Sequence, residues 1–180
     1  MIIYIHGFGS SGQGEKSCAF RQYFKKNKIP FIAPSLSVIP ELALSTLEEL
    51  IESYENVVLI GSSLGGYYAL YLSSKYNIKC VLINPSIYPY TTLREELPQT
   101  INFYDDKEYS YHIEKLKSYE VNHLEEQNIF LLLQKGDTVL DYREALKKMP
   151  KVKTILEEKG NHRFDGIERY FDEIHHFILY

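Results

Sequence analysis

The chain has 180 residues, of which 44% are apolar and 24% are charged, and its formal net charge is −4. We expect residues 1–180 to form one domain around one core, because no low-complexity linker interrupts them. The small negative charge excludes a basic surface for nucleic acid or anionic membranes. No apolar run approaches the ~20 residues that span a bilayer, and the N-terminal MIIYIHG lacks signal-peptide features, so we expect a cytoplasmic protein without a nucleic-acid or membrane partner.

Six short apolar runs predict β-strands: residues 2–5, 30–33, 57–60, 80–83, 129–133 and 152–156. Most of these runs are continuously apolar rather than alternating, as in parallel strands that are covered on both faces. Several stretches between them are long enough for helices. The pattern therefore predicts an α/β fold, a three-layer α/β/α sandwich with a mostly parallel sheet.

The clearest predicted helix is residues 40–53, PELALSTLEELIES. Its apolar side chains have the i, i+3, i+4, i+7 spacing of one buried stripe. The stripe consists of Leu42, Leu44, Leu47, Leu50 and Ile51. Residues 141–149 and 165–179 are also expected to be helical.

Residues 85–127 interrupt this alternation of strands and helices. The interval is long, polar and rich in tyrosine, and we predict a short cap-like excursion over the sheet. Its one clear amphipathic piece is residues 110–119, a predicted helix with Ser110 as its N-cap.

Residues 61–65, GSSLG, fit the pattern G-x-S-x-G between a predicted strand and a helix-compatible segment. In such a turn the serine adopts a strained conformation that exposes its hydroxyl, and the glycines let strand and helix approach closely. The pattern indicates that Ser63 is a nucleophile. The alternative is a glycine turn without chemistry.

A serine nucleophile needs a base, and the base needs an acid that orients it. His162 lies in a loop after the last predicted strand, and Asp137 follows the strand before it. Because the carboxyl ends of parallel strands share one edge of the sheet, this order predicts that the three side chains meet there. Asp141 is an alternative acid, although the segment LDYREAL favours it as a helix N-cap.

Residues 6–12, HGFGSSG, allow two interpretations. The three glycines fit the dinucleotide pattern G-x-G-x-x-G, but no acidic residue follows about 20 positions later to hold a ribose. We therefore prefer an oxyanion loop, in which the amide N–H groups of Phe8 and Leu64 face a developing negative charge. His6 is expected to brace this loop.

Five segments, HGFGSS, GSSLGGYYALYL, INPS, LLLQKGDTVLDYREA and KGNHRFDGIERYF, resemble the α/β-hydrolase superfamily, specifically its small YqiA-type esterases. The resemblance covers nearly the whole chain. It implies a serine hydrolase that acts on carboxylic esters or thioesters without a cofactor, with Ser63 as nucleophile, His162 as base and Asp137 as acid. Since the chain begins directly in MIIYIHGF, we expect the fold to be truncated at the N-terminus, without the first two strands of larger members.

This interpretation assigns the excursion a role in substrate binding. We predict that Ile87, Tyr88, Tyr90 and Leu93 line an acyl pocket, or alternatively that they only cover the helices of the sheet. The two cysteines lack paired spacing, and no metal site is predicted. Two other functions remain open: an inactive binding or scaffold protein with this fold, and a hydrolase of another acyl bond, such as a peptide or lactone.

Overall fold

The computed structural model describes residues 1–96 and 106–180 of the chain. Within them, six strands form one sheet in the order β2-β1-β3-β4-β5-β6, and every neighbouring pair is parallel. The strands are β1 (Ile2–Ile5), β2 (Phe31–Ile32), β3 (Val58–Ser62), β4 (Cys80–Ile83), β5 (Ile129–Gln134) and β6 (Lys153–Glu157). Each strand overlaps a predicted run, and the mostly parallel sheet is confirmed.

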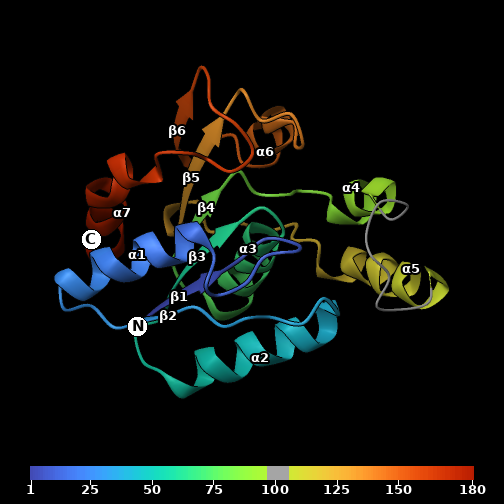
Figure 1. The fold of residues 1–180 in the computed structure, drawn as a ribbon, viewed down its shortest axis with the longest axis horizontal. Helices are drawn as coiled ribbons and strands as arrows, with labels where there is room; N and C mark the ends of the chain where they lie inside the picture. The colour runs from blue at the N-terminus through green and yellow to red at the C-terminus, as the bar shows by residue number, and fades with distance from the viewer. Residues whose placement is uncertain (97–105) are drawn as a thin grey trace.

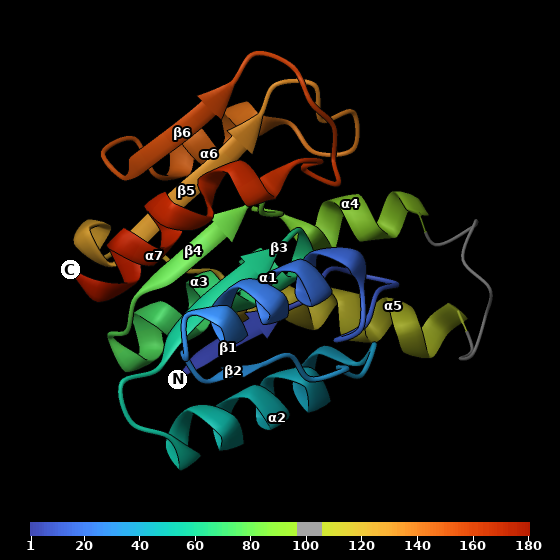
Figure 2. The ribbon, with the colours of Figure 1, turned by 60° about the vertical axis from the view of Figure 1, so that its left-hand side comes forward.

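Helices cover both faces of the sheet (Figures 1 and 2). They are α1 (Glu15–Lys26), α2 (Pro40–Ser53), α3 (Leu64–Tyr76), α4 (Pro89–Glu96), α5 (Asp106–Lys115), α6 (Tyr142–Lys148) and α7 (Phe171–Leu179), with short 3-10 helices η2 (Leu116–Tyr119), η3 (Glu126–Asn128) and η4 (Ile167–Tyr170). α1 and α7 lie side by side on one face, where the ring centroids of Phe20 and Phe171 are 4.6 Å apart. α2, α3 and α6 cover the other face, which completes the predicted three layers.

The strands divide their side chains between two cores, one on each face of the sheet. In β1, Ile3 and Ile5 belong to the core under α2 and α3, whereas Ile2 and Tyr4 belong to the core under α1 and α7. This alternation follows from the two-residue period of a strand. Because both faces are buried, the strands are apolar at nearly every position, which is the pattern that predicted them.

Helix α2 has the predicted bounds, but one residue of its predicted stripe is wrong. Leu42 is 55% exposed, and Ala43 is fully buried instead. The buried positions Ala43, Leu44, Leu47 and Ile51 form one stripe, and Leu42 lies about 155° around the helix from the centre of that stripe, because each residue of an α-helix turns by about 100°.

The predicted excursion contains α4 and α5, which lie beyond the carboxyl edge of the sheet (Figure 1). Its residues 97–105 lie outside the described residues. Ser110 is inside α5, which begins at Asp106, so the prediction of Ser110 as an N-cap is wrong. Several side-chain contacts hold the excursion against the rest of the domain. Among them, the Tyr67 hydroxyl donates to the Leu116 carbonyl at 2.6 Å, and His112 Nδ1 lies 3.1 Å from a carboxylate oxygen of Glu41 in α2. Among the described residues, no helix has both the length and the apolar character needed to cross a membrane.

Candidate active site

Ser63 stands at the sharp turn between β3 and α3. Its backbone has φ 55° and ψ −123°, a combination that a residue with a Cβ rarely adopts and that costs on the order of 1–3 kcal/mol. Hydrogen bonds hold the turn: the Ser63 carbonyl accepts from the amides of Gly66 at 2.9 Å and Ser86 at 3.0 Å, and the Ser63 amide donates to the Ile83 carbonyl at 3.1 Å. The surrounding backbone therefore fixes the strained conformation.

The glycines of the GSSLG segment are required by close backbone contacts. A Cβ on Gly65 would lie 2.1 Å from the carbonyl oxygen of Ile5, and a Cβ on Gly61 would lie 2.2 Å from the carbonyl oxygen of Gly65. Both distances are far below van der Waals contact. Glycine at these positions lets α3 begin directly against β1 and β3, as the pattern predicts.

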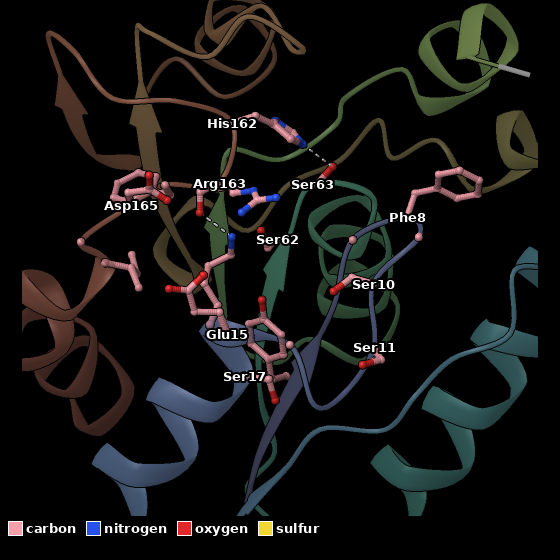
Figure 3. Close-up of a pocket in the computed structure, with 18 of the residues that line it drawn as sticks. Phe8, Ser10, Ser11, Glu15, Ser17, Ser62, Ser63, His162, Arg163 and Asp165 are labelled. Carbon is pink, nitrogen blue, oxygen red and sulfur yellow. Dashed lines mark hydrogen bonds between the residues drawn. The ribbon is translucent and has the colours of Figure 1, made fainter. Parts of the chain in front are cut away.

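The three predicted side chains meet at the carboxyl edge of the sheet. His162 Nε2 lies 3.1 Å from Ser63 Oγ, and His162 Nδ1 lies 2.8 Å from Asp137 Oδ2 (Figure 3 shows the contact with Ser63). The Asp137 side chain is only 2% exposed, whereas that of His162 is 27% exposed. An imidazole in this position can take a proton from the hydroxyl while the carboxylate holds the opposite nitrogen as its N–H form.

Asp137 is held by three donors. Besides the imidazole, the amides of Val139 and Leu140 donate to its Oδ1 at 2.8 and 2.9 Å. Burial by itself raises the pKa of the Asp137 carboxyl, but these hydrogen bonds outweigh burial, so the pKa lies below its ordinary value. The carboxylate is therefore ionised at neutral pH.

Asp141, the alternative acid, is the N-cap of α6. Its Oδ1 accepts from the backbone amide of Arg143 at 3.0 Å and so caps α6, and both carboxylate oxygens contact Nε of the same arginine. This is the capping role that the LDYREAL segment predicts.

The loop that carries His162 is fixed by two buried amide side chains. Asn84, at the end of β4, donates from Nδ2 to the backbone carbonyl oxygens of Asn161 at 3.0 Å and His162 at 3.4 Å. Its Oδ1 accepts from the backbone N–H of Gln134 at 2.9 Å. Gln134 is fully buried at the end of β5, and its Oε1 accepts from the backbone N–H of Asn161 at 2.8 Å. We refer to these residues as the Asn84–Gln134 network.

The loop after β1 packs against Ser63. His6 is buried and braces the loop as expected: its Nε2 accepts from the Leu36 amide at 2.9 Å, which leaves Nδ1 to donate to the Gly7 carbonyl at 2.8 Å. The Phe8 ring turns away from the larger cavity in Figure 3. The amide of Leu64 begins α3, where helix N–H groups have no acceptor within the helix. The residues of the two predicted oxyanion donors, Phe8 and Leu64, line one cavity together with Ser63 and His162.

Two cavities adjoin Ser63 and His162. The larger, about 510 Å³, extends from Ser63 to the N-terminus of α1, where Glu15 and Ser17 lie in Figure 3. The smaller, about 190 Å³, lies toward α4 and the loop after β5. Its lining residues other than Ser63 and His162 are Phe8, Leu64, Ser86, Pro89, Thr92, Leu93, Val139 and Leu140.

Comparison with known protein families identifies the chain. The model of the uncharacterised protein family UPF0227 matches residues 1–179. The chain belongs to the UPF0227 family. It is 26% identical to UPF0227 protein PM0825 of Pasteurella multocida and 22% identical to UPF0227 protein YcfP of Salmonella paratyphi A, with 98% of each chain covered in both comparisons.

Solved structures show which fold this UPF0227 member has. A candidate hydrolase from Agrobacterium vitis S4 superposes with a TM-score of 0.78 at 20% identity, covering 98% of this chain and 87% of the other. Est1E from Butyrivibrio proteoclasticus, solved with ferulic acid bound, gives 0.76 at 12% identity (99% and 87% covered), and the Pyrococcus furiosus esterase PF2001 gives 0.71 at 16% (99% and 80% covered). The fold is that of the α/β hydrolases, and the predicted resemblance is confirmed.

The predicted substrate-binding residues of this UPF0227 member lie in different places. Leu93 lines the smaller cavity. Ile87 is buried in the core, and Tyr88 and Tyr90 pack against that core with their rings 6.1 Å apart. These three residues line neither cavity beside Ser63.

Sequence reasoning did not find the role of Gln134. In the sequence, Gln134 is a polar residue at the end of the apolar run IFLLLQ. Many residue types occur at such a position, where a strand leads into a surface loop. Only the structure reveals that Gln134 is fully buried and linked to the His162 loop.

Proposed function

We propose that this UPF0227 member is a serine hydrolase that cleaves carboxylic esters or thioesters through an acyl-enzyme on Ser63. The observation that carries the proposal is the position of one imidazole, 3.1 Å from the Ser63 hydroxyl and 2.8 Å from the Asp137 carboxylate. The names of two proteins with the same fold, Est1E and the Pyrococcus furiosus esterase, are consistent with this reaction class.

In the first half-reaction, Ser63 Oγ attacks the carbonyl carbon of the substrate and His162 Nε2 takes the hydroxyl proton. The carbonyl oxygen becomes an oxyanion, which accepts hydrogen bonds from the amides of Phe8 and Leu64. The intermediate collapses, the bond from the carbonyl carbon to the leaving oxygen or sulfur breaks, and His162 donates its proton to that atom. The products of this step are the free alcohol or thiol and an acyl ester on Ser63.

In the second half-reaction, water replaces the leaving group. His162 Nε2 takes a proton from the water molecule while the water oxygen attacks the acyl carbon. The second tetrahedral intermediate then expels Ser63 Oγ, which recovers the proton from His162, and the carboxylic acid departs. The ionised Asp137 stabilises the imidazolium in both halves, which is why a pKa below the ordinary value suits its role.

The strained serine argues against a scaffold protein without chemistry. A turn that only joins a strand to a helix has no need of φ 55° at a residue with a Cβ, and glycine at position 63 would remove that strain. The buried, charged Asp137 beside a partly exposed histidine is a further cost that structure alone does not require.

Hydrolysis of p-nitrophenyl butyrate tests the proposal. We expect wild-type protein to turn over the ester and Ser63→Ala to lose at least about 10³-fold in kcat. Ser74→Ala is the matched control, because Ser74 is exposed on the same helix α3 and its hydroxyl bonds the His123 carbonyl away from the site. Equal turnover by Ser63→Ala and wild type would overturn the proposal.

A further inference from the structure

The two cavities beside Ser63 differ in chemistry as well as in size. Apolar side chains, among them Leu64, Leu93 and Leu140, make most of the wall of the smaller cavity. The larger cavity has a polar wall with five hydroxyl groups besides that of Ser63. These belong to Tyr4, Ser10, Ser11, Ser17 and Ser62.

The larger cavity also carries charges of both signs. Lys16 and Arg163 line it together with Glu15, Asp165 and Glu168. The Lys16 ammonium donates to the Arg163 carbonyl at 2.5 Å and so spans the cavity wall between α1 and the His162 loop. Because the charges nearly balance, this wall suits a neutral ligand rich in hydrogen-bonding groups better than an anion.

His162 lines both cavities, and the residues that follow it indicate which cavity receives which part of a substrate. The base must donate its proton to the leaving atom, so the leaving group lies on the side of His162. Residues 163–168, which directly follow His162, line only the larger cavity. Of the two proposed oxyanion donors, Leu64 lines only the smaller cavity, whereas Phe8 lines both.

The second half-reaction leads to the same assignment. The water that attacks the acyl-enzyme approaches along the path by which the leaving group departed, since the same base serves both steps. That path must therefore admit water after the leaving group has departed. The polar wall of the larger cavity offers water more hydrogen-bond partners than the mostly apolar wall of the smaller one.

From these observations, and resting on the proposed function, we propose that the natural substrate pairs a short apolar acyl group with a bulky, neutral, hydroxyl-rich alcohol or thiol. The acyl group occupies the smaller cavity and the leaving group occupies the larger. At about 30 Å³ per group of water size, the smaller cavity, about 190 Å³, holds about six such groups. The larger, about 510 Å³, holds about 17.

Two esters with the same acyl group test the leaving-group half of the proposal. Glucose 6-butyrate and cyclohexylmethyl butyrate both place a six-membered ring one carbon from the ester oxygen, and they differ in the ring oxygen and the hydroxyl groups of glucose. We expect kcat/KM to be at least about tenfold higher for the glucose ester. Equal values, or a preference for the cyclohexyl ester, would overturn the assignment of the larger cavity.

A series with one leaving group tests the acyl half. Among p-nitrophenyl acetate, butyrate, octanoate and palmitate, we expect kcat/KM to be highest for butyrate and to fall by about tenfold or more at palmitate. Leu93→Trp, which fills the smaller cavity, should move the optimum to acetate, and Leu93→Ala should move it toward octanoate. A palmitate optimum, or an optimum that neither variant moves, would overturn the assignment of the smaller cavity.

Lys16→Met provides the matched variant in the larger cavity. Because Lys16 bonds the His162 loop, the comparison uses the two esters that share an acyl group: the variant should lower kcat/KM for glucose 6-butyrate at least about threefold more than for cyclohexylmethyl butyrate. A parallel loss on both esters would count against the proposal. Failure of the proposed function has a different result: no ester in either series would be hydrolysed in a Ser63-dependent way.

Discussion

Asp137 is the residue for which the sequence leaves two candidates and the structure favours one. Asp137 contacts His162 at 2.8 Å, whereas Asp141, four positions later, caps α6 and contacts Arg143. The two carboxylates thus differ in their partners although they lie in the same loop region. Substituting each one separately measures whether this difference has functional consequences.

We predict that Asp137→Asn lowers kcat for p-nitrophenyl butyrate by about 10⁴-fold, because an amide presents no charge to the imidazolium and favours the wrong tautomer of His162. Asp141→Asn is the control and should stay within about threefold, since only a helix cap weakens. Circular dichroism of both variants checks that they fold. A larger loss for Asp141→Asn than for Asp137→Asn would reverse the assignment of the acid.

At the scale of elements, the Asn84–Gln134 network ties three segments together. Asn84 follows β4, Gln134 ends β5, and their side chains bond the backbone of Asn161 and His162 in the loop after β6. The network thereby makes the position of the imidazole depend on the sheet. We infer that Asn84 is a positioning residue for His162.

We predict that Asn84→Gly lowers kcat by about 10²-fold with little change in KM, because a loosened loop displaces the imidazole from Ser63 without altering the cavities. Glycine is the informative replacement, since Asn84 has φ 38°, where another side chain would add strain. Asn128→Ala, at the opposite end of β5, removes a side-chain bond to Asn77 and serves as control. An unchanged kcat in Asn84→Gly would exclude a positioning role.

The elements were predictable where local pattern and burial agree. Continuous apolar runs identified the strands because both faces of the sheet are covered, and the order of Ser63, Asp137 and His162 after successive strands predicted the geometry that brings them together. The prediction for Leu42 was wrong because Leu42, about 160° around the helix from Leu44, was counted with the stripe, and a single apolar side chain can also lie on the exposed face of a helix. The pattern also gave no sign of the two cavities, whose walls come from segments far apart in the chain.

At the scale of the whole molecule, hydrogen-bonded carboxylates connect the site to the stability of the sheet. Glu157, at the end of edge strand β6, accepts hydrogen bonds from Arg169, Tyr170 and Gln134. Burial alone raises the pKa of the Glu157 carboxyl, but these donors outweigh it and the pKa lies below its ordinary value, as it does for Asp137.

We predict that acid destabilises the protein through these two carboxylates. A carboxyl whose pKa is lowered in the folded state stabilises fully above its unfolded pKa, about 3.9 for Asp and 4.3 for Glu, and this stabilisation is lost as the pH falls through the lower folded pKa. The free energy of unfolding in urea should therefore decrease from pH 5 toward pH 2. Glu157→Gln should flatten the decrease, and Glu49→Gln, on the exposed side of α2, should not.

Covalent labelling tests the central claim, that His162 and Asp137 make Ser63 a nucleophile, most directly. A fluorophosphonate probe should add to wild-type protein as Ser63 Oγ forms a bond to phosphorus and fluoride leaves, which intact mass and peptide mapping would locate at Ser63. Ser63→Ala should take up no probe, and His162→Ala should react at least about 10²-fold more slowly. Labelling that persists undiminished in Ser63→Ala, or that is as fast without the imidazole, would contradict the claim.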